Sequence, residues 1–405
     1  MLQSLQIFQQ ELQQELNNIL EYWMRHTPDL ENGGFYGSVN NNNQPSGTAP
    51  KAVVLHARIL WTFSAAYRRS GNKAYLAIAE HAFDYIGRKF NDPEYAGVYW
   101  SVDASGKMLD GRKQVYGLAF CIYGSSEYAA ATDDKTALDY AIHLYNLIEK
   151  YSYDRVNNGY IEAFSRTWQP VDDLRLSTKD ANEKKTMNTH LHIIEAYAAL
   201  YKVWPNENLQ QKIENLLAVI DQYFINHKTY HLRLFFDERW SERVDVISYG
   251  HDIEAGWLLQ QCAEIIGKKK WIEKYRQYAV KLTNAAMSGI DKDGGLWYEY
   301  EQKSKHLIKE KHWWPQAEAM VGFYNTYQVT NDESYLQLAI NSWNFIKRYL
   351  LDKTNGEWFW GINEDYNIMQ GQDKAGFWKC PYHNARACME VIARIEWINN
   401  ENEQD

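Results

Sequence analysis

The sequence predicts an all-α protein, an (α/α)6 barrel of twelve helices in two concentric rings with short β-hairpin loops at one end. Three observations predict this class. A motif of glycine and aromatic residues recurs along the chain, each interval has room for two helices and little else, and the two helices differ in their apolar pattern. We expect residues 1–405 to form a single catalytic domain, because no linker interrupts the series.

The recurring motif, called here the marker turn, is typical of a tight turn or a short pair of strands. Five copies read GGFYG, GVYWSVD, GYIEAF, GLWYEYE and GEWFWGI, while a sixth, HLRLFFD, lacks the glycine. The spacings between successive copies are 63, 62, 72, 64 and 61 residues, measured between Gly34, Gly97, Gly159, His231, Gly295 and Gly356.

The two helices between successive marker turns differ in their apolar faces. The second helix of each pair carries a one-sided apolar stripe, in residues 75–86, 134–150, 209–224, 270–288 and 333–350. The first helix is apolar or small on most sides, in residues 52–67, 117–130, 189–201, 254–266 and 317–327. Helices over 2–26 and 381–398 complete the twelve. We therefore place the first helices in the inner ring and the second helices in the outer ring.

An open α-solenoid of helix pairs is the alternative to a closed barrel. A set of six pairs without polar capping repeats favours closure. The polar segments NNNNQPSGTAP (40–50) and LRLSTKDANEKK (174–185) are interpreted as loops rather than linkers.

Composition narrows the function classes. The net charge of −9 argues against nucleic acid and anionic membranes as partners. The first residues do not resemble a signal peptide, no apolar run is long enough to span a membrane, and four scattered cysteines fit neither a disulfide framework nor a zinc site. We expect a cytoplasmic protein. The 16 Trp, 30 Tyr and 14 Phe provide flat rings, and sugars are the usual ligands that need both rings and hydrogen bonds.

Unusual polar residues gather near the N-terminal halves of the inner helices. Because these helices run in the same direction, we expect the side chains to converge at one mouth of the barrel and to form a pocket. The candidates are Arg58, Tyr116, Asn188, His192, His251, Glu254, Trp314, Glu318, Trp378 and His383.

Some candidates allow two interpretations. His251 and Glu254 share a helix face, so the carboxylate either fixes the tautomer of a catalytic imidazole or simply satisfies a buried one. His383 lies near a helix N-terminus, where the dipole keeps the pKa of an imidazole low, and Arg386 shares its face. His383 is either a catalytic base or an interior histidine bonded to the backbone. Arg58 either pairs with an acid or meets an oxyanion in the cavity.

No metal or cofactor is expected. The sequence lacks HEXXH, P-loop, GxGxxG, GxSxG and CxxC motifs. His190 and His192 are two residues apart and therefore point to different sides of a helix. The chemistry must then come from histidines, acids and an arginine.

Five motifs in one order resemble the N-acylglucosamine 2-epimerase superfamily and, within it, the cellobiose 2-epimerase branch. They read HARILW, KTMNTHLHIIEAY, SYGHDIEA, WWPQAEAMVGF and GFWKCPYHNARACMEV. The resemblance runs from ENGGFYG to the C-terminal helix, and its clearest departure is Ala385, where some relatives have glycine. It implies an (α/α)6 barrel and cofactor-free, reversible inversion at C2 of a reducing-end aldose, cellobiose to glucosyl-mannose or lactose to epilactose.

The resemblance also implies roles for the candidates. His251 and His383 match the two catalytic histidines, Glu254 the supporting glutamate, and Arg58 the arginine that stabilises the enolate. His192 matches a third pocket histidine. The remaining positions match residues that line the substrate site, namely Tyr116, Asn188, Trp314, Glu318 and Trp378.

Four other functions remain open at this point. An aldose–ketose isomerase uses the same enediolate, and a monosaccharide or N-acylglucosamine 2-epimerase shares the superfamily. An inverting glycosidase would use Glu254 and Glu318 as its acid and base. A non-catalytic sugar-binding protein would need the aromatic residues alone. We expect a small-molecule sugar as the partner and a monomer or weak homodimer.

Overall fold

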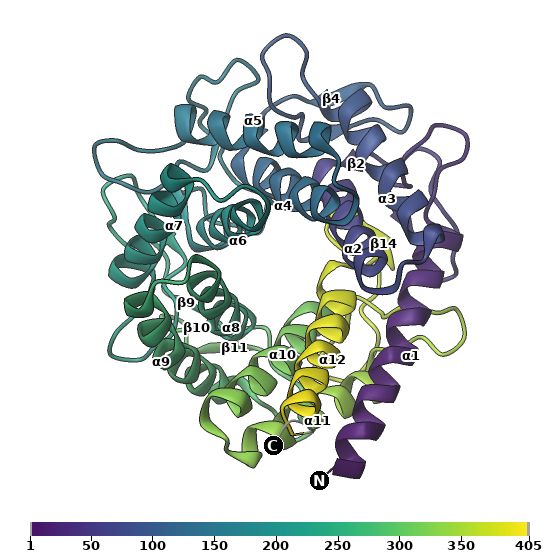
Figure 1. Ribbon diagram of the computed structural model, residues 1–405, viewed down its shortest axis with the longest axis vertical. Coiled ribbons are helices and arrows are strands. Elements are labelled where there is room, and N and C mark those ends of the chain that lie inside the picture. Colours follow the sequence, from purple (N-terminus) through teal and green to yellow (C-terminus); the bar gives the residue numbers. More distant parts are fainter. Residues whose placement is uncertain (1, 403–405) are drawn as a thin grey trace.

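Twelve α-helices form two concentric rings in the computed structural model, which describes residues 2–402 and the side chains of residues 5–397 (Figure 1). The outer ring consists of α1 (Leu2–His26), α3 (Lys73–Tyr85), α5 (Lys135–Tyr151), α7 (Glu207–Val219), α9 (Lys269–Ala286) and α11 (Glu333–Tyr349). The inner ring consists of α2 (Val53–Ser70), α4 (Val115–Thr132), α6 (Met187–Val203), α8 (Tyr249–Ile266), α10 (Trp313–Thr330) and α12 (Tyr382–Asn402). The predicted (α/α)6 barrel is confirmed.

The burial of the two rings follows the apolar patterns of the sequence. In the inner helix α4, every residue from Val115 to Ala129 is buried. The outer helix α7 instead buries a stripe that includes Leu209, Ile213 and Leu216. A helix with protein on both sides gains nothing from a polar face, whereas an outer helix needs one towards solvent. Short helical turns extend α3, α7 and α9, as Ile86–Phe90, Ile220–Phe224 and Met287–Gly289.

The ring closes through α12. This helix packs against α10 on one side and α2 on the other, and α1 covers it from outside (Figure 1). In an open solenoid the first and last units stay apart. The solenoid alternative is therefore wrong.

Short antiparallel strands lie at one end of the barrel, as expected. They pair as β1–β14, β2–β3–β4, β5–β6, β7–β8, β9–β10–β11 and β12–β13. In the largest sheet, Tyr300 lies opposite both Ile247 and Leu307. The strands are β1 (Ser38–Val39), β2 (Lys51–Ala52), β3 (Ser101–Val102), β4 (Met108–Asp110), β5 (Lys113–Gln114), β6 (Ala163–Phe164), β7 (Lys185–Thr186), β8 (Phe235–Phe236), β9 (Val246–Ser248), β10 (Glu299–Glu301), β11 (His306–Ile308), β12 (Lys311–His312), β13 (Gly361–Ile362) and β14 (Ala375–Gly376).

These strands determine where the inner helices start. The helices α2, α4, α6, α8 and α10 begin directly after β2, β5, β7, β9 and β12, respectively. Four of them start earlier than predicted, because pairing of the preceding strand fixes the start more strongly than the first apolar residue does. Their predicted starts were 117, 189, 254 and 317, and their observed starts are Val115, Met187, Tyr249 and Trp313.

Each marker turn is closed by an antiparallel β-bridge, as its motif predicted. The bridges join Pro28 to Phe35, Asn91 to Val98, Tyr153 to Tyr160, Ile225 to Leu232, Ile290 to Leu296 and Leu351 to Trp358. Four of the turns donate a backbone N–H to an inner helix. The bonds run from Phe35 to His56 (3.1 Å), Tyr160 to His190 (2.9 Å), Leu232 to Asp252 (2.7 Å) and Leu296 to Gln316 (2.7 Å). The repeated motif therefore reflects, in part, a repeated hydrogen bond that holds each of these turns against an inner helix.

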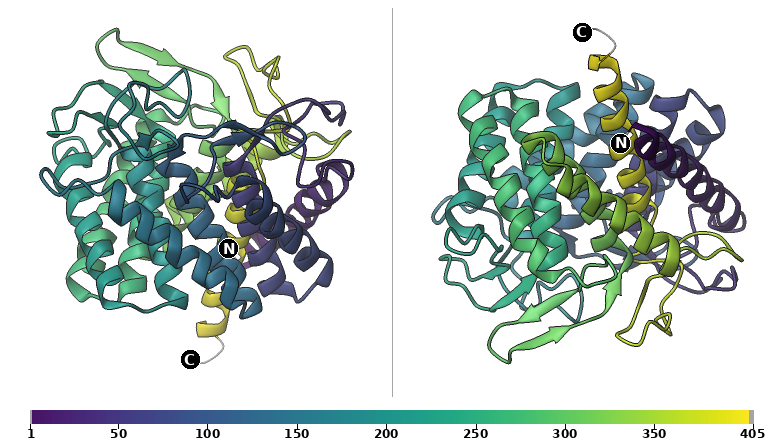
Figure 2. Two further views of the ribbon diagram at one scale, coloured as in Figure 1. Left: turned by 90° about the horizontal axis from the view of Figure 1, so that it is seen from above. Right: turned by 90° about the horizontal axis from the view of Figure 1, so that it is seen from below.

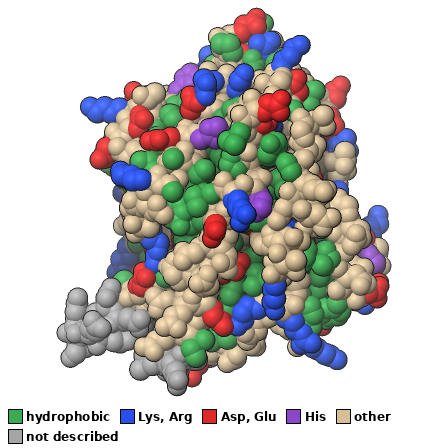
Figure 3. All heavy atoms as spheres, turned by 90° about the vertical axis from the view of Figure 1, so that its right-hand side faces the viewer, with side chains coloured by type: hydrophobic (Ala, Val, Ile, Leu, Met, Phe, Trp, Pro, Cys, Tyr) green, Lys and Arg blue, Asp and Glu red, His purple; other side chains and the backbone are tan. Residues whose placement is uncertain are grey.

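The two ends of the barrel differ. Figure 2 shows the β10–β11 hairpin and long connecting loops at one end, and the C-terminal end of α12 at the other. The face in Figure 3 carries acidic and basic side chains interspersed, without a large area of one sign. None of the helices in the described part of the chain is both long and apolar enough to cross a membrane.

Candidate active site

A cavity of about 900 Å³ lies at the end of the barrel where the inner helices begin. The prediction that the candidate residues converge there is confirmed for all but one of them. The cavity is lined by Arg58, Tyr116, Asn188, His192, His251, Glu254, Trp314, Trp378 and His383. Glu318 lies behind the wall, with its Oε1 2.7 Å from Nδ1 of His383.

His251 of α8 and His383 of α12 both line the cavity, and in each ring Nε2 is the nitrogen left free of hydrogen bonds within the described part of the chain. Both rings contact the indole of Trp314 on the intervening α10, with ring centroids 4.8 and 5.7 Å from it. Nδ1 of His251 lies 2.8 Å from Oγ of Ser248, and Nδ1 of His383 lies 2.7 Å from Oε1 of Glu318. Neither Nε2 has a hydrogen bond to any described residue. Two imidazoles therefore offer Nε2 to a molecule in the cavity.

Two other buried histidines show what a structural role looks like. Nδ1 of His56 lies 2.8 Å from the carbonyl oxygen of Ala52, and Nδ1 of His190 lies 2.7 Å from that of Thr186. Their Nε2 atoms accept the marker-turn N–H groups given above. With both nitrogens bonded within the protein, these rings serve the fold. His192, two residues from His190, instead lines the cavity, which confirms that the pair points to different sides of α6.

The predicted contact between Glu254 and His251 is wrong. Nδ1 of His251 contacts Ser248, three residues before it, and Glu254 accepts a hydrogen bond from Nη2 of Arg386 at 3.0 Å. Helical side chains lean towards the helix N-terminus, so His251, in the first turn of α8, reaches back to Ser248. The full charge of a guanidinium also attracts a carboxylate more strongly than a neutral imidazole does.

Arg386 of α12 connects carboxylates from three other inner helices. Its Nη1 donates to Glu195 at 2.5 Å, and its Nη2 donates to Glu254 at 3.0 Å and Glu318 at 2.7 Å. Glu195 also contacts Nδ1 of His192 at 2.8 Å. All these groups are buried. A continuous chain of hydrogen bonds thus runs from His192 through Glu195 and Arg386 to Glu318, the carboxylate that holds His383.

The sequence contained a signal for part of this chain. Glu195 follows His192 by three residues, the same spacing that drew attention to His251 and Glu254, yet it was not among the candidates. Arg386 was noted only for its place on the His383 face. Ser248 was missed because the predicted helix began at residue 254, whereas α8 begins directly after this serine.

The acidic groups next to His383 have the composition of a metal site. Ligand atoms of Glu254, Glu318 and His383 lie within 4.8 Å of one another. Nη2 of Arg386 donates to both carboxylates, so a metal ion bound by them would have to displace a buried guanidinium. We therefore interpret the two carboxylates as partners of Arg386 rather than as metal ligands.

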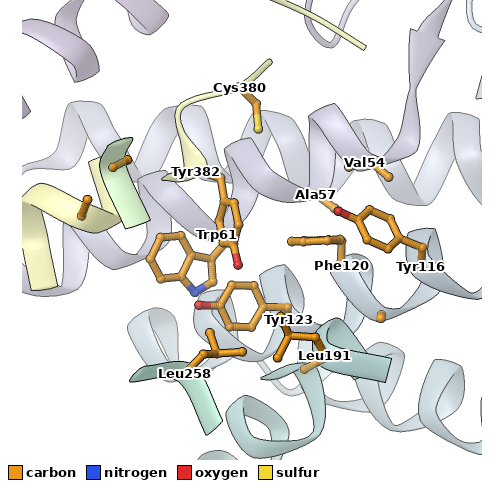
Figure 4. Packing of buried hydrophobic residues seen from close by; sticks show 14 of the residues in the cluster. Val54, Ala57, Trp61, Tyr116, Phe120, Tyr123, Leu191, Leu258, Cys380 and Tyr382 are labelled. Atoms are coloured by element: carbon orange, nitrogen blue, oxygen red, sulfur yellow. The ribbon is translucent and has the colours of Figure 1, made fainter. Parts of the chain in front are cut away.

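Arg58 reaches the cavity from α2 over an aromatic floor. Its Nη2 donates to the Tyr116 hydroxyl at 2.6 Å, and its Nη1 donates to the carbonyl oxygen of Trp378 at 3.3 Å. The guanidinium lies 4.2 Å from the centroid of the Phe120 ring. Figure 4 shows the Phe120 ring between those of Tyr382 and Tyr116, with Tyr123 below it and Trp61 beside Tyr382. Of the two sequence interpretations, the cavity position fits, since no described acid pairs with Arg58.

Burial sets the protonation states of the site. It lowers the pKa of His251 and of His383 to about 3, so both imidazoles are neutral at neutral pH. Burial raises the pKa of Glu254, and the neighbouring Glu318 raises it further. Burial acts in the same direction on Glu318, but Arg386 and His383 bring the pKa of Glu318 below its usual value. Glu318 is therefore the ionised partner of His383.

The outer part of the cavity is formed by the loop that contains residues 174–183 and by the β10–β11 hairpin. Nε2 of Gln114 donates to the carbonyl oxygens of Leu174 at 3.2 Å and Arg175 at 3.0 Å, and so holds the start of this loop. Glu299 of β10 lines the same part, where burial raises the pKa of its carboxyl to about 7. The sequence identified the loop but gave it no place in the site.

Comparison with known proteins gives long and consistent matches. The model of the N-acylglucosamine 2-epimerase family matches residues 33–387. A Bacteroides fragilis protein named cellobiose 2-epimerase is 46% identical over 96% of this chain and 99% of its own length. A Dictyoglomus turgidum protein of the same name is 38% identical over 96% and 100%. The solved structure of cellobiose 2-epimerase from Bacillus thermoamylovorans has a TM-score of 0.91 at 39% identity, covering 96% of this chain and 100% of that one.

Proposed function

The chain belongs to the N-acylglucosamine 2-epimerase family, and we propose that its cavity inverts C2 of the reducing-end glucose of β-1,4-linked disaccharides. The chain is an epimerase of the isomerase class. Cellobiose gives glucosyl-mannose, and lactose gives epilactose. The 46% identity over nearly the full length of a protein named cellobiose 2-epimerase supports the choice of a disaccharide.

The reaction begins when the sugar ring opens. The proton on C2 is acidic only in the open-chain form, where C1 is an aldehyde. One imidazole takes this proton on Nε2, and the electrons of the C–H bond move to the C1 oxygen to give a cis-enediolate. The other imidazole gains a proton as the first ring gives its own up to exchangeable groups of the site, and delivers it to the opposite face of C2, so both rings end neutral as they began. C2 is inverted, and the sugar keeps its atoms and its oxidation state.

Each of the candidate residues has a part in this reaction. His251 and His383 exchange the proton. Arg58 is always charged and stabilises the enediolate oxygen. His192 lies on the same cavity wall as Asn188 and serves ring opening, while the indoles of Trp314 and Trp378 hold the sugar face. Tyr116 positions Arg58, and Glu318 and Glu254 act through His383 and Arg386.

One observation carries the proposal. Two neutral imidazoles on different helices contact one indole, each has Nδ1 fixed by a neighbour, and each leaves Nε2 for the cavity. Inversion at a carbon requires two such groups, one for each face. A glycosidase that used Glu254 and Glu318 would need two carboxylates facing the substrate, but Glu318 does not line the cavity.

Product analysis tests the proposal. The protein is incubated separately with cellobiose, lactose, mannose and N-acetylglucosamine, and the sugars are identified by chromatography and NMR. We expect the C2 epimers of the two disaccharides. A ketose as the main product indicates an aldose–ketose isomerase, and turnover of the monosaccharides alone indicates another branch of the family. Released glucose indicates a glycosidase, and binding without turnover indicates a sugar-binding protein.

Two further properties complete the proposal. We propose that the protein acts as a monomer or weak homodimer, which light scattering of the purified protein measures directly. We also propose that it works in the cytoplasm. The four cysteines are buried and unpaired, as suits a reducing compartment, and fractionation of the source cells tests the location.

A further inference from the structure

Ser248 lies at the position where a serine usually caps a helix, but its side chain does not do so. It is the residue directly before α8, and its hydroxyl accepts no backbone N–H from the first turn. In the neighbouring inner helix α6, Thr186 occupies the equivalent position and accepts the N–H of Thr189 at 3.2 Å. Serine is among the preferred capping residues, so the missing cap indicates that the hydroxyl has another use.

That use is the imidazole of His251. Oγ of Ser248 lies 2.8 Å from Nδ1 of the ring. Among the described residues, the hydroxyl makes no other hydrogen bond. Ser248 is fully buried, and pairing with Glu299 in the β9–β10 ladder fixes its backbone. The hydroxyl is therefore held in one place on the side of the ring that faces away from the cavity.

The other two candidate histidines have a different kind of partner. His192 and His383 contact the carboxylates of Glu195 and Glu318 through Nδ1. An ionised carboxylate only accepts hydrogen bonds and stabilises a charged imidazolium, whereas a hydroxyl is neutral. The titratable groups whose charges act on His251 are His192, His383 and Glu318, from three other inner helices. Of the three candidate histidines, His251 is thus the one without a carboxylate on Nδ1.

We propose that Ser248 is a positioning residue for His251, whose hydroxyl accepts the Nδ1 proton and so makes Nε2 the atom that exchanges protons with C2. This inference rests on the proposed function. The neutral hydroxyl fixes the tautomer without favouring the imidazolium. As a result, protonated His251 gives up its proton more readily than protonated His383. His251 is then the stronger acid on one face of the sugar, and His383 is the stronger base on the other.

The test combines kinetics with imidazole NMR on the full chain. In Ser248→Ala we expect kcat to fall about tenfold, the rate equivalent of one lost hydrogen bond, with little change in KM. The ¹⁵N spectrum, with His251 assigned from His251→Gln, should show the Nδ1–H tautomer in the wild type and its loss in Ser248→Ala. Ser248→Thr, which keeps the hydroxyl, should restore both. In Ser248→Asp, a carboxylate stabilises the imidazolium, so the acid limb of the kcat–pH profile should move to higher pH.

Asp134→Ala is the matched control for a helix cap. Asp134 caps α5 far from the cavity, accepting the N–H groups of Thr136 and Ala137, so its loss should lower Tm and leave kcat unchanged. Ser248→Ala should instead lower kcat and leave Tm nearly unchanged. If that variant does not fold, Ser248→Cys, with a weakly bonding thiol, takes its place.

Two outcomes overturn the inference. One is a kcat within about twofold of the wild type in Ser248→Ala, since a lost hydrogen bond costs more than that. The other is a His251 spectrum that the substitution does not change. A wild-type protein that epimerises no sugar instead refutes the proposed function, while the spectrum still tests the contact between Ser248 and His251.

Discussion

Replacing Glu318 with glutamine tests whether the carboxylate of Glu318 makes His383 a stronger base. The amide keeps the shape of the side chain but removes the negative charge that lies 2.7 Å from Nδ1 of His383. When Nε2 takes the C2 proton, the ring becomes an imidazolium, and the carboxylate stabilises it through a charged hydrogen bond. The substitution therefore acts on the charged state that forms during the reaction.

The structure sets the size of the effect. A hydrogen bond to a charged group contributes about 1.5–3 kcal/mol, and each 1.4 kcal/mol changes a rate about tenfold. We therefore expect kcat of Glu318→Gln to fall about 10- to 150-fold. Because Glu318 does not line the cavity, KM should change little. Initial rates with cellobiose, followed by chromatography, measure both constants.

A control separates this effect from a general loss of stability. Asp92→Asn breaks another buried ion pair, with Lys113, away from the cavity. Both variants should unfold at a lower temperature, but only Glu318→Gln should lose kcat. If Glu318→Gln keeps kcat within about threefold of the wild type, the carboxylate does not stabilise the imidazolium and the reasoning is refuted.

Three further predictions follow from the site. Arg58→Lys keeps the positive charge but loses the planar guanidinium that donates to Tyr116 and stabilises the enediolate oxygen. We therefore expect kcat to fall about a hundredfold in initial-rate assays. The lowered pKa of His251 and His383 keeps both neutral, so kcat/KM should stay constant from about pH 8 to about pH 5, and an acid limb near pH 6.5 contradicts this. Burial raises the pKa of Glu162 to about 7, a shift that stabilises the fold at low pH. In the wild type, urea unfolding should show the free energy of unfolding decreasing by about 3 kcal/mol as the pH rises from about 4.5 to about 7, and Glu162→Gln should lack this decrease.

The fold could be predicted because its pattern repeats. The marker turns and the alternation of helices such as α4 and α7 are local features, and six repetitions outweigh errors in any one. The helix starts were less accurate, since the first turns of α8 and α10 contain Gly250 and Pro315 and carry little helical signal of their own. Those starts are set by strand pairing between distant segments.

The site was predictable as a set of residues but not as a set of contacts. Helix direction and register brought His251 and His383 to one cavity. Which acid meets which histidine depends on charges from other helices, and Arg386, on α12, draws Glu254 away from His251. A spacing of three residues makes such a contact possible, and the competition between partners decides it.

Deuterium incorporation at C2 tests most directly whether His251 and His383 act on the two faces of the same carbon. In heavy water, cellobiose treated with the wild-type protein should give an epimer with deuterium at C2. We expect His251→Ala and His383→Ala each to lose both the epimer and the exchange. Exchange at the full rate in both variants would contradict the assignment of these two imidazoles.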